Sequence, residues 1–271
     1  MKKLIPIISF MILLFACTGR QEKSQNTIQS QPAIPTIDYF LVKSFPHDTS
    51  AFTEGFLVYE GKLYESTGAS QEFPQTRSLF GEVDLKTGKI EKKVELDRMK
   101  YFGEGITFLN GKVFQLTYKT KVGFVYDAKS FQKINEFTFP SDEGWGMTTD
   151  KTNLVMSDGT HKLTYLNPNT LQATKTLSVY ENGHVKDNLN ELEFINGFIY
   201  ANIWMTNTIV KINPDDGNVV GLLDLTSLAD EVKNLYPSSQ EMNGIAYDQA
   251  NDKVYVTGKL WPKIYQIKFN Y

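Results

Sequence analysis

The sequence contains a single cysteine, Cys17, among its 271 residues. One thiol cannot form a disulfide within the chain, so stability must come from core packing and from closure of the fold. Histidine is also scarce, because only His47, His161 and His184 are present, and they lack the spacing of a zinc-binding pair. These absences argue against a disulfide framework and against a zinc cluster.

No block of basic residues stands out. The 28 Lys and Arg residues are set against 31 Asp and Glu residues, which gives a net charge of −3. Nucleic-acid-binding proteins concentrate positive charge on one face, so no nucleic-acid partner is expected. The sequence also lacks a Gly-rich phosphate loop and the Gly-x-Ser-x-Gly elbow of serine hydrolases. Nothing in it calls for a cofactor or a bound metal.

The first 17 residues are typical of an export signal. Lys2 and Lys3 precede an apolar run over residues 4–15, which is short for a membrane span of about 20 residues. Leu14-Phe15-Ala16-Cys17 resembles the lipobox of bacterial lipoproteins. That resemblance implies signal cleavage and lipidation of Cys17, with an uncleaved anchor helix or a coincidental cysteine as the alternatives. We expect a protein of the bacterial cell envelope, anchored on the periplasmic side of the outer membrane or at the cell surface and touching the membrane only through the lipid.

Residues 18–36 are rich in Gln, Ser and Pro and have almost no large apolar side chains. Such a segment cannot bury enough surface to order itself, and the composition is typical of a flexible tether. The globular part is therefore predicted for residues 37–271, a length that one all-β domain can use entirely.

A hairpin unit recurs five times in this domain. Its clearest copy, residues 101–118, has two alternating strands joined by Asn110-Gly111, the strongest short-range signal of a β-hairpin. The aligned copies start at Gly55, Gly105, Gly146, Glu191 and Gly244, so the period is 41 to 53 residues. Two further strands follow each of the first four copies. Four short strands in a period of about 45 residues indicate a blade of a β-propeller.

The fifth copy has only three strands, whereas an unpaired alternating strand over residues 39–45 precedes the first copy. We predict that this N-terminal strand completes the last blade. The fold is then an all-β, five-bladed propeller with a closed ring. One helical stretch is expected near residues 227–235, in the longest insertion.

The residues that lead into each innermost strand are predicted to meet at one end of the ring, where propellers bind ligands. Aromatic, acidic and amide side chains recur there at equivalent places. The five segments are Phe52-Thr53-Glu54-Gly55, Phe102-Gly103-Glu104-Gly105, Glu143-Gly144-Trp145-Gly146, Asn188-Leu189-Asn190-Glu191 and Glu241-Met242-Asn243-Gly244.

These segments and their surroundings resemble the plant and bacterial glutaminyl-peptide cyclotransferases, the type found in papaya latex. The resemblance runs from about Phe52 to the C-terminus, and its most specific motifs are LNELE followed by ANIW, and GKLWPK. It implies a five-bladed propeller and an acyltransferase that converts the N-terminal glutamine of a peptide or protein into pyroglutamate, with release of ammonia and without a metal. We expect the enzyme to be a monomer.

The resemblance also implies roles for individual residues. Glu104 matches the acid/base glutamate, which would take a proton from the α-amine and give one to the departing ammonia. Asn190 and Lys259 match polar residues that suit carboxamide positioning and charge stabilisation. The matching walls and apolar lining are Trp145, Trp204, Phe52 and Phe102. Asn243 is added to the pocket from its place in the fifth copy, whereas Trp261 is expected to pack in the core.

Two positions depart from the plant pattern. Glu54 stands where that pattern has Gln, and Tyr118 stands where it has Trp. Tyr118 keeps an aromatic wall with a polar tip. Glu54 adds a second carboxylate that could bind the substrate's ammonium or share the proton work, because two nearby carboxylates push their pKa values apart. Which of Glu54 and Glu104 is the main base stays open at this point.

Two functions of other classes are alternatives. A non-catalytic surface propeller could bind protein or glycan through the same mouth, in which case the carboxylate would be dispensable. A metal-dependent hydrolase of the lactonase type would need several ligands on the axis, and Glu54, Glu104, Asn190 and Asn243 could be such a set. Loss of activity in a chelator would favour the second.

Overall fold

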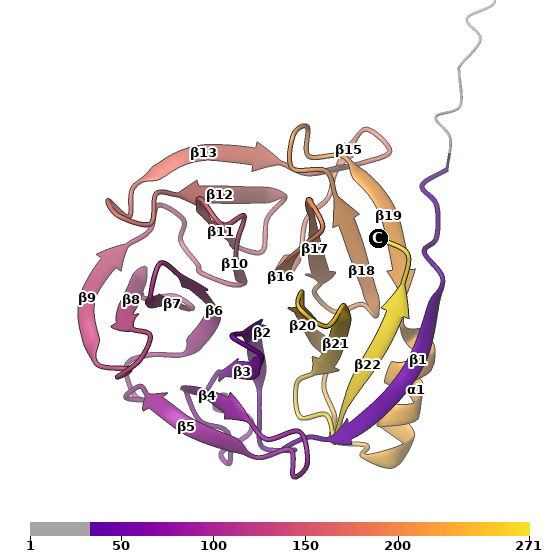
Figure 1. The fold of residues 1–271 in the computed structure, drawn as a ribbon, viewed down its shortest axis with the longest axis horizontal. Coiled ribbons are helices and arrows are strands. Elements are labelled where there is room, and N and C mark those ends of the chain that lie inside the picture. The colour runs from indigo at the N-terminus through magenta and orange to yellow at the C-terminus, as the bar shows by residue number, and fades with distance from the viewer. Residues whose placement is uncertain (1–32) are drawn as a thin grey trace, which may run out of the picture. The chain divides into compact units, whose positions relative to one another are not determined.

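The computed structural model describes residues 33–271, so the predicted signal peptide, Cys17 and the tether up to residue 32 lie outside the described residues. Five four-stranded antiparallel sheets stand around a central axis (Figure 1). The five-bladed, all-β propeller predicted from the repeats is confirmed. No helix within residues 33–271 is both long and apolar enough to cross a membrane.

The blades follow one another in chain order. The first consists of β2 (Thr53–Tyr59), β3 (Lys62–Thr67), β4 (Leu79–Val83) and β5 (Ile90–Glu95). The second consists of β6 (Gly103–Leu109), β7 (Lys112–Thr117), β8 (Val122–Asp127) and β9 (Lys133–Thr138). The third consists of β10 (Met147–Thr149), β11 (Leu154–Ser157), β12 (Lys162–Leu166) and β13 (Ala173–Ser178). The fourth consists of β16 (Leu189–Ile195), β17 (Phe198–Ile203), β18 (Thr208–Ile212) and β19 (Val219–Asp224). The fifth consists of β20 (Met242–Asp248), β21 (Lys253–Gly258), β22 (Lys263–Phe269) and β1 (Tyr39–Pro46).

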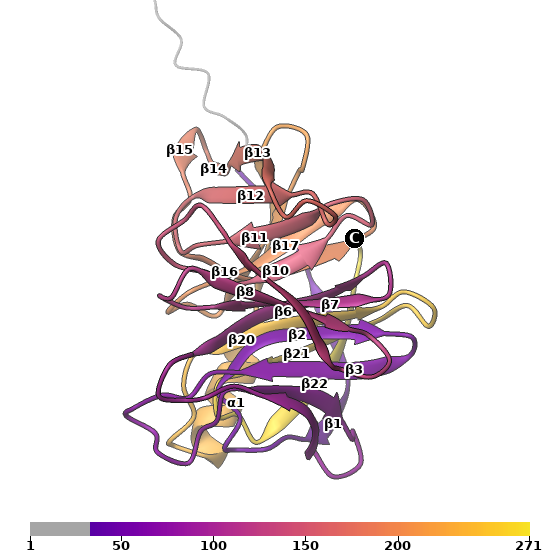
Figure 2. The same ribbon diagram turned by 90° about the vertical axis from the view of Figure 1, so that its left-hand side faces the viewer.

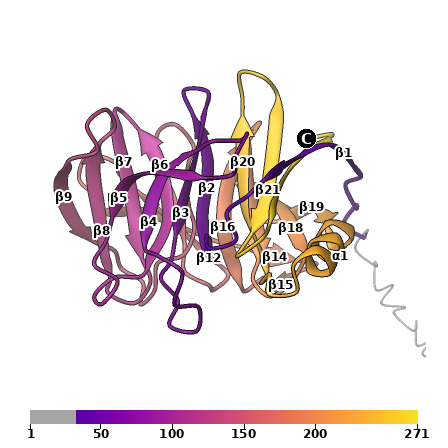
Figure 3. The ribbon, with the colours of Figure 1, turned by 90° about the horizontal axis from the view of Figure 1, so that it is seen from below.

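Two elements lie outside this scheme. A short hairpin of β14 (Tyr180–Glu181) and β15 (His184–Val185) follows β13 at the outer edge of the ring (Figure 2). Helix α1 (Thr226–Leu235) lies in the expected insertion, outside blades four and five (Figure 3). It packs through Leu228 and Val232 on the apolar cluster between those blades.

Three of the inner hairpins turn at residue pairs that adopt the backbone conformation of a tight β-turn. Glu60-Gly61, Asn110-Gly111 and Asn196-Gly197 link the first two strands of blades one, two and four, and both residues of each pair have positive φ. Two consecutive positive φ values are the requirement of a type I′ turn, whose twist matches that of the flanking strands. The turn therefore fixes the register of each hairpin.

The ring is closed by strand β1. It pairs antiparallel with β22 from Tyr39 opposite Phe269 to Pro46 opposite Lys263, beside the C-terminal strand in Figure 1. The prediction that the N-terminal strand completes the last blade is confirmed. The contacts begin slightly earlier than predicted, because the Pro35 carbonyl and the Ile37 N–H both bond to Leu222 of β19. The end of the expected tether is therefore part of the folded domain.

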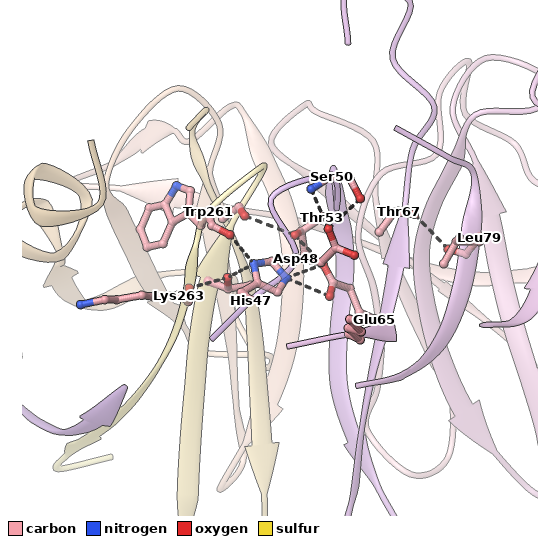
Figure 4. A network of polar contacts seen from close by, with 12 residues as sticks. His47, Asp48, Ser50, Thr53, Glu65, Thr67, Leu79, Trp261 and Lys263 are labelled. Carbon is pink, nitrogen blue, oxygen red and sulfur yellow. Dashed lines mark hydrogen bonds and ion pairs between the residues drawn. The ribbon is translucent and has the colours of Figure 1, made fainter. Parts of the chain in front are cut away.

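A buried polar network ties the closing blade to the first blade (Figure 4). His47, directly after β1, lies 3.0 Å from a carboxylate oxygen of Glu65 on β3, and Thr53 donates a 2.6 Å hydrogen bond to the same carboxylate. The other ring nitrogen of His47 lies 2.8 Å from the Trp261 carbonyl. Burial lowers the pKa of His47, but Glu65 more than offsets this, and the net shift is upward. The two ring nitrogens thus face acceptors in two different blades.

The core consists of five apolar clusters within the described residues, and each cluster is formed by two neighbouring blades. The innermost strands come very close, because a Cβ on Gly105 would lie only 2.4 Å from the backbone nitrogen of Met147 in the next blade. Glycine at this position therefore lets the strands approach, and the loops leading into them converge on the axis.

Candidate active site

A cavity of about 210 Å³ lies at the end of the ring where the innermost strands begin. It receives side chains from all five blades and is referred to below as the cup. Its lining consists of Phe52, Glu54, Phe102, Glu104, Tyr118, Trp145, Asn190, Trp204, Glu241 and Lys259. Except for Glu241, every lining residue is one that the sequence placed in the pocket.

Irregular strand pairing aims three of these side chains. The register shifts between Thr53 and Gly55, between Gly103 and Ile106, and between Leu189 and Leu192. Glu54, Glu104 and Asn190 lie within these three bulges. A β-bulge adds an unpaired residue to one strand and redirects its side chain. The bulges thus turn residues of an otherwise regular innermost strand into the cup.

Two serines fix the backbone at the same points. The Ser66 hydroxyl on β3 donates a 2.6 Å hydrogen bond to the carbonyl of Glu104 in the following blade. The Ser157 hydroxyl on β11 does the same for Asn190, at 2.7 Å. All four residues are buried. The position of each polar site residue is therefore set by the neighbouring blade as well as by its own.

Lys259 is held between two carboxylates. Its Nζ lies 3.0 Å from Glu54 Oε1 and 3.1 Å from Glu241 Oε1, and it stands 4.7 Å from the centre of the Phe52 ring. Burial lowers the pKa of Lys259, but the carboxylates of Glu54, Glu241 and Glu104 outweigh burial and raise it overall. The residue is therefore a permanent cation.

The two acids beside Lys259 behave differently. Burial raises the pKa of Glu54 to about 7, although the Lys259 ammonium opposes the shift. Burial acts in the same direction on Glu241, but Lys259 and the Trp204 N–H lower the pKa of that carboxyl overall. Glu241 is thus ionised at neutral pH, whereas Glu54 titrates there.

The carboxyl of Glu104 is buried but has no hydrogen-bond partner among the described residues. Its residue is 5 % exposed, and no side chain or backbone group within residues 33–271 hydrogen-bonds to its carboxyl oxygens. Burial raises the pKa of Glu104 well above its usual value, and the charge of Glu54 adds to the effect while Lys259 opposes it. Glu54, by contrast, is bonded to Lys259 and accepts a 3.1 Å hydrogen bond from Asn243. Among the three carboxyls that line the cup, that of Glu104 is the one with no ion pair or hydrogen bond to the described residues.

Five aromatic rings follow one another around the cup. Successive ring centres lie 6.0 Å apart from Phe52 to Phe102, 5.9 Å from Phe102 to Tyr118, 6.5 Å from Tyr118 to Trp145 and 5.6 Å from Trp145 to Trp204. Trp204 is 39 % exposed and forms the rim. Such a wall excludes water from the carboxylates and strengthens electrostatic interactions inside the cup.

Gly68 makes room for one of these rings. A Cβ at Gly68, just after β3, would stand 2.1 Å from atoms of the Phe102 ring. The equivalent position carries Tyr118 after β7, Trp204 after β17 and Lys259 after β21. Blade one therefore has no side chain at this position, and the Phe102 ring of the next blade occupies that part of the wall.

The sequence prediction for blade five needs one correction. Asn243 is fully buried and does not line the cup, because its Nδ2 donates to the Thr53 carbonyl at 2.9 Å and to Glu54 at the blade seam. Glu241, two residues earlier, lines the cup instead. A usable signal existed, because Glu241 occupies the place of Phe52 and Phe102 in the aligned segments and a buried lysine requires a counter-charge. Trp261 packs in the core as expected, with its N–H donating to the Gln240 carbonyl.

Within the part of the chain that the structure describes, no three His, Cys, Asp or Glu side chains come together as a metal-binding group. Of the residues that line the cup, Lys259 is the one that carries a positive charge.

Comparisons with known proteins agree with this geometry. The family model described as glutamine cyclotransferase matches residues 10–269. A glutaminyl-peptide cyclotransferase of Arabidopsis thaliana is 41 % identical over 231 residues, which cover 84 % of this chain and 70 % of that protein. The crystal structure of Myxococcus xanthus glutaminyl cyclase superposes with a TM-score of 0.77 at 28 % identity, covering 87 % of this chain and 98 % of the other. The chain therefore belongs to the glutamine cyclotransferase family.

Proposed function

We propose that this protein is a glutaminyl-peptide cyclotransferase in which Glu104 moves the protons and no metal takes part. The enzyme converts the N-terminal glutamine of a peptide into pyroglutamate and releases ammonia, which makes it an acyltransferase. The observation that carries the proton role is the buried carboxyl of Glu104, which has no hydrogen-bond partner among the described residues, whereas Glu54 in the same cup is paired with Lys259.

The reaction begins with a proton transfer. The substrate's α-ammonium has a pKa of about 8, and burial raises the pKa of Glu104, which lowers the cost of moving the proton from the amine to the carboxylate. The neutral amine then attacks the carbon of its own γ-carboxamide. Glu104 gives its proton to the departing nitrogen and receives one from the new ring nitrogen, so that ammonia leaves and the lactam remains.

Lys259 and Asn190 act on the carboxamide. Attack places a negative charge on the carboxamide oxygen, and the fixed ammonium of Lys259 is suited to stabilise it in the dry cup. Glu241 keeps this ammonium in place. Asn190 Oδ1 is buried and has no hydrogen-bond partner within residues 33–271. An unsatisfied buried acceptor is costly, and an N–H of the bound carboxamide would satisfy it.

Glu54 is suited to the substrate's amine. Its carboxylate shares the cup with Glu104, and its raised pKa of about 7 is consistent with a group that gains a second cation when the substrate's ammonium enters. This assignment gives the two acids separate roles: Glu54 binds the amine, and Glu104 transfers protons.

The test is an ammonia-release assay on Gln-Ala dipeptide with the purified protein. We expect release with formation of pyroglutamyl-Ala, unchanged by a chelator, and no release from Ala-Gln, which has no N-terminal glutamine. Absence of release at every pH between 5 and 9 would refute the proposed function. Loss of activity in the chelator, restored by a divalent metal, would refute the metal-independent mechanism.

Envelope anchoring through Cys17 is a further part of the proposal, supported by the lipobox-like Leu14-Phe15-Ala16-Cys17 and the polar residues that follow it. In a bacterial host, we expect the wild-type protein in the membrane fraction and the Cys17→Ser variant out of it, as measured by immunoblotting of fractions. Equal membrane association of both would contradict the lipid anchor.

A further inference from the structure

An open groove of about 600 Å³ adjoins the cup. The two cavities share Tyr118, Trp145 and Trp204, so the aromatic wall of the cup is also one side of the groove. Most of its other lining residues come from loops of blades two and three, among them Glu143 and Asp158. The groove thus begins at the rim over which anything larger than the cup must leave.

A peptide substrate is larger than the cup. At about 210 Å³ the cup has room for little more than one glutamine residue, and pyroglutamate formation requires that residue to be inside. The second and third residues of the peptide must then lie outside the aromatic wall, where the groove continues the cavity. This step rests on the proposed function.

The charges that line the groove are all negative. Its lining includes Asp142, Glu143 and Asp158 but no Lys or Arg. Lys121 neutralises Asp142, and Lys119 lies 3.4 Å from Glu143, which also accepts a hydrogen bond from the Trp145 N–H at 2.9 Å. Two of the three acids are therefore already engaged.

Asp158 is the acid that remains available. Its Oδ1 accepts hydrogen bonds from the backbone N–H and the hydroxyl of Thr160, at 3.1 Å and 2.6 Å, which fix the carboxylate's direction. No Lys, Arg or His within residues 33–271 forms an ion pair with it. We propose that the groove binds the second and third residues of the peptide substrate, and that Asp158 makes it favour a cationic side chain there.

The expected preference is modest and sensitive to salt. Ion pairs between partly exposed groups change equilibria by roughly two- to fivefold, and salt screens them. At low ionic strength we therefore expect kcat/KM to be about two- to fivefold higher for Gln-Arg-Ala and Gln-Ala-Arg than for Gln-Glu-Ala and Gln-Ala-Glu, with Gln-Ala-Ala between them. The difference should shrink at about 0.5 M NaCl.

Variants of the full chain separate this site from general effects. Asp158→Asn keeps the acceptor for Thr160 but removes the charge, and the preference should disappear while Gln-Ala-Ala is cyclised as before. Asp158→Lys should reverse it in favour of the glutamate peptides. Asp216→Asn is the matched control. Asp216 accepts a hydrogen bond from the Asn218 N–H, as Asp158 does from the Thr160 N–H. It lies in the turn between β18 and β19, at the end of blade four that is remote from the cup.

The outcomes are distinct. Equal rates for all five peptides, or a preference that survives both Asp158 variants, would overturn the subsite while leaving the cyclisation intact. A preference lost equally in Asp216→Asn would also overturn it. Failure to cyclise any of the five peptides would instead count against the proposed function itself.

Discussion

Replacing Glu104 with Gln should lower kcat for Gln-Ala by about 100- to 10,000-fold, the usual contribution of a positioned acid/base group. The substitution keeps the shape of the side chain but removes the group that can take the α-amine proton and pass one to ammonia. Because the carboxyl has no partner to lose within residues 33–271, the thermal unfolding temperature should stay within a few degrees of the wild type. Steady-state ammonia release and a thermal melt provide the measurements.

Glu54→Gln is the matched control, since it removes the other carboxylate of the cup and installs the residue of the plant pattern. We expect it to lose far less rate than Glu104→Gln. The Glu54 charge raises the pKa of Glu104, so removing it lowers that pKa. The acidic limb of the kcat/KM profile should therefore move to lower pH. A larger loss in Glu54→Gln than in Glu104→Gln would exchange the roles assigned to the two acids.

Replacing Lys259 with Met should lower kcat/KM by about 100- to 1,000-fold, the effect of deleting one oxyanion-stabilising group. The thioether side chain fills similar space without a charge. Glu54 and Glu241 would lose their counter-ion, and the pKa of Glu54, which Lys259 holds down, would rise further. Most of the loss should fall on kcat, because charge develops on the carboxamide oxygen only during attack.

A structural role alone would give a different pattern for Lys259. If the ammonium served only to hold the cup together, Lys259→Arg, which keeps the charge between Glu54 and Glu241, would restore both stability and rate. We expect it to restore stability but little of the rate, because the planar guanidinium cannot occupy the position of a compact ammonium. Full activity in Lys259→Arg, or an effect of Lys259→Met confined to KM, would contradict the oxyanion role.

The catalytic arrangement depends on irregularities within a regular ring. Each blade is a four-stranded antiparallel sheet, and inner strands that paired without interruption would keep side chains alternating between the two faces of a blade. The bulges at Glu54, Glu104 and Asn190 break this alternation near the start of the strand. The site thus rests on equivalent local distortions in blades one, two and four, which the ring brings together at its axis.

The sequence alone determined the fold and most of the site. Alternating strands, the Asn110-Gly111 turn and the repeat of about 45 residues are local signals. An unpaired strand at the N-terminal end of the domain and a last copy with only three strands then leave closure as the solution. The equivalent segments before each inner strand then place Glu104, Asn190 and Trp145 at one mouth, because a ring superposes equivalent positions.

Tertiary structure alone decided how the side chains share the cup. The sequence favoured Glu104 as the base but left Glu54 as a second candidate, and only distance shows that Glu54 is paired with Lys259. It also selected Asn243, although that amide faces the blade seam and Glu241 faces the cup. The repeat in the sequence determines which residues lie at the end of the ring where the cup is. Ion pairing and burial depend on contacts between blades that are far apart in the chain, and no local pattern encodes them.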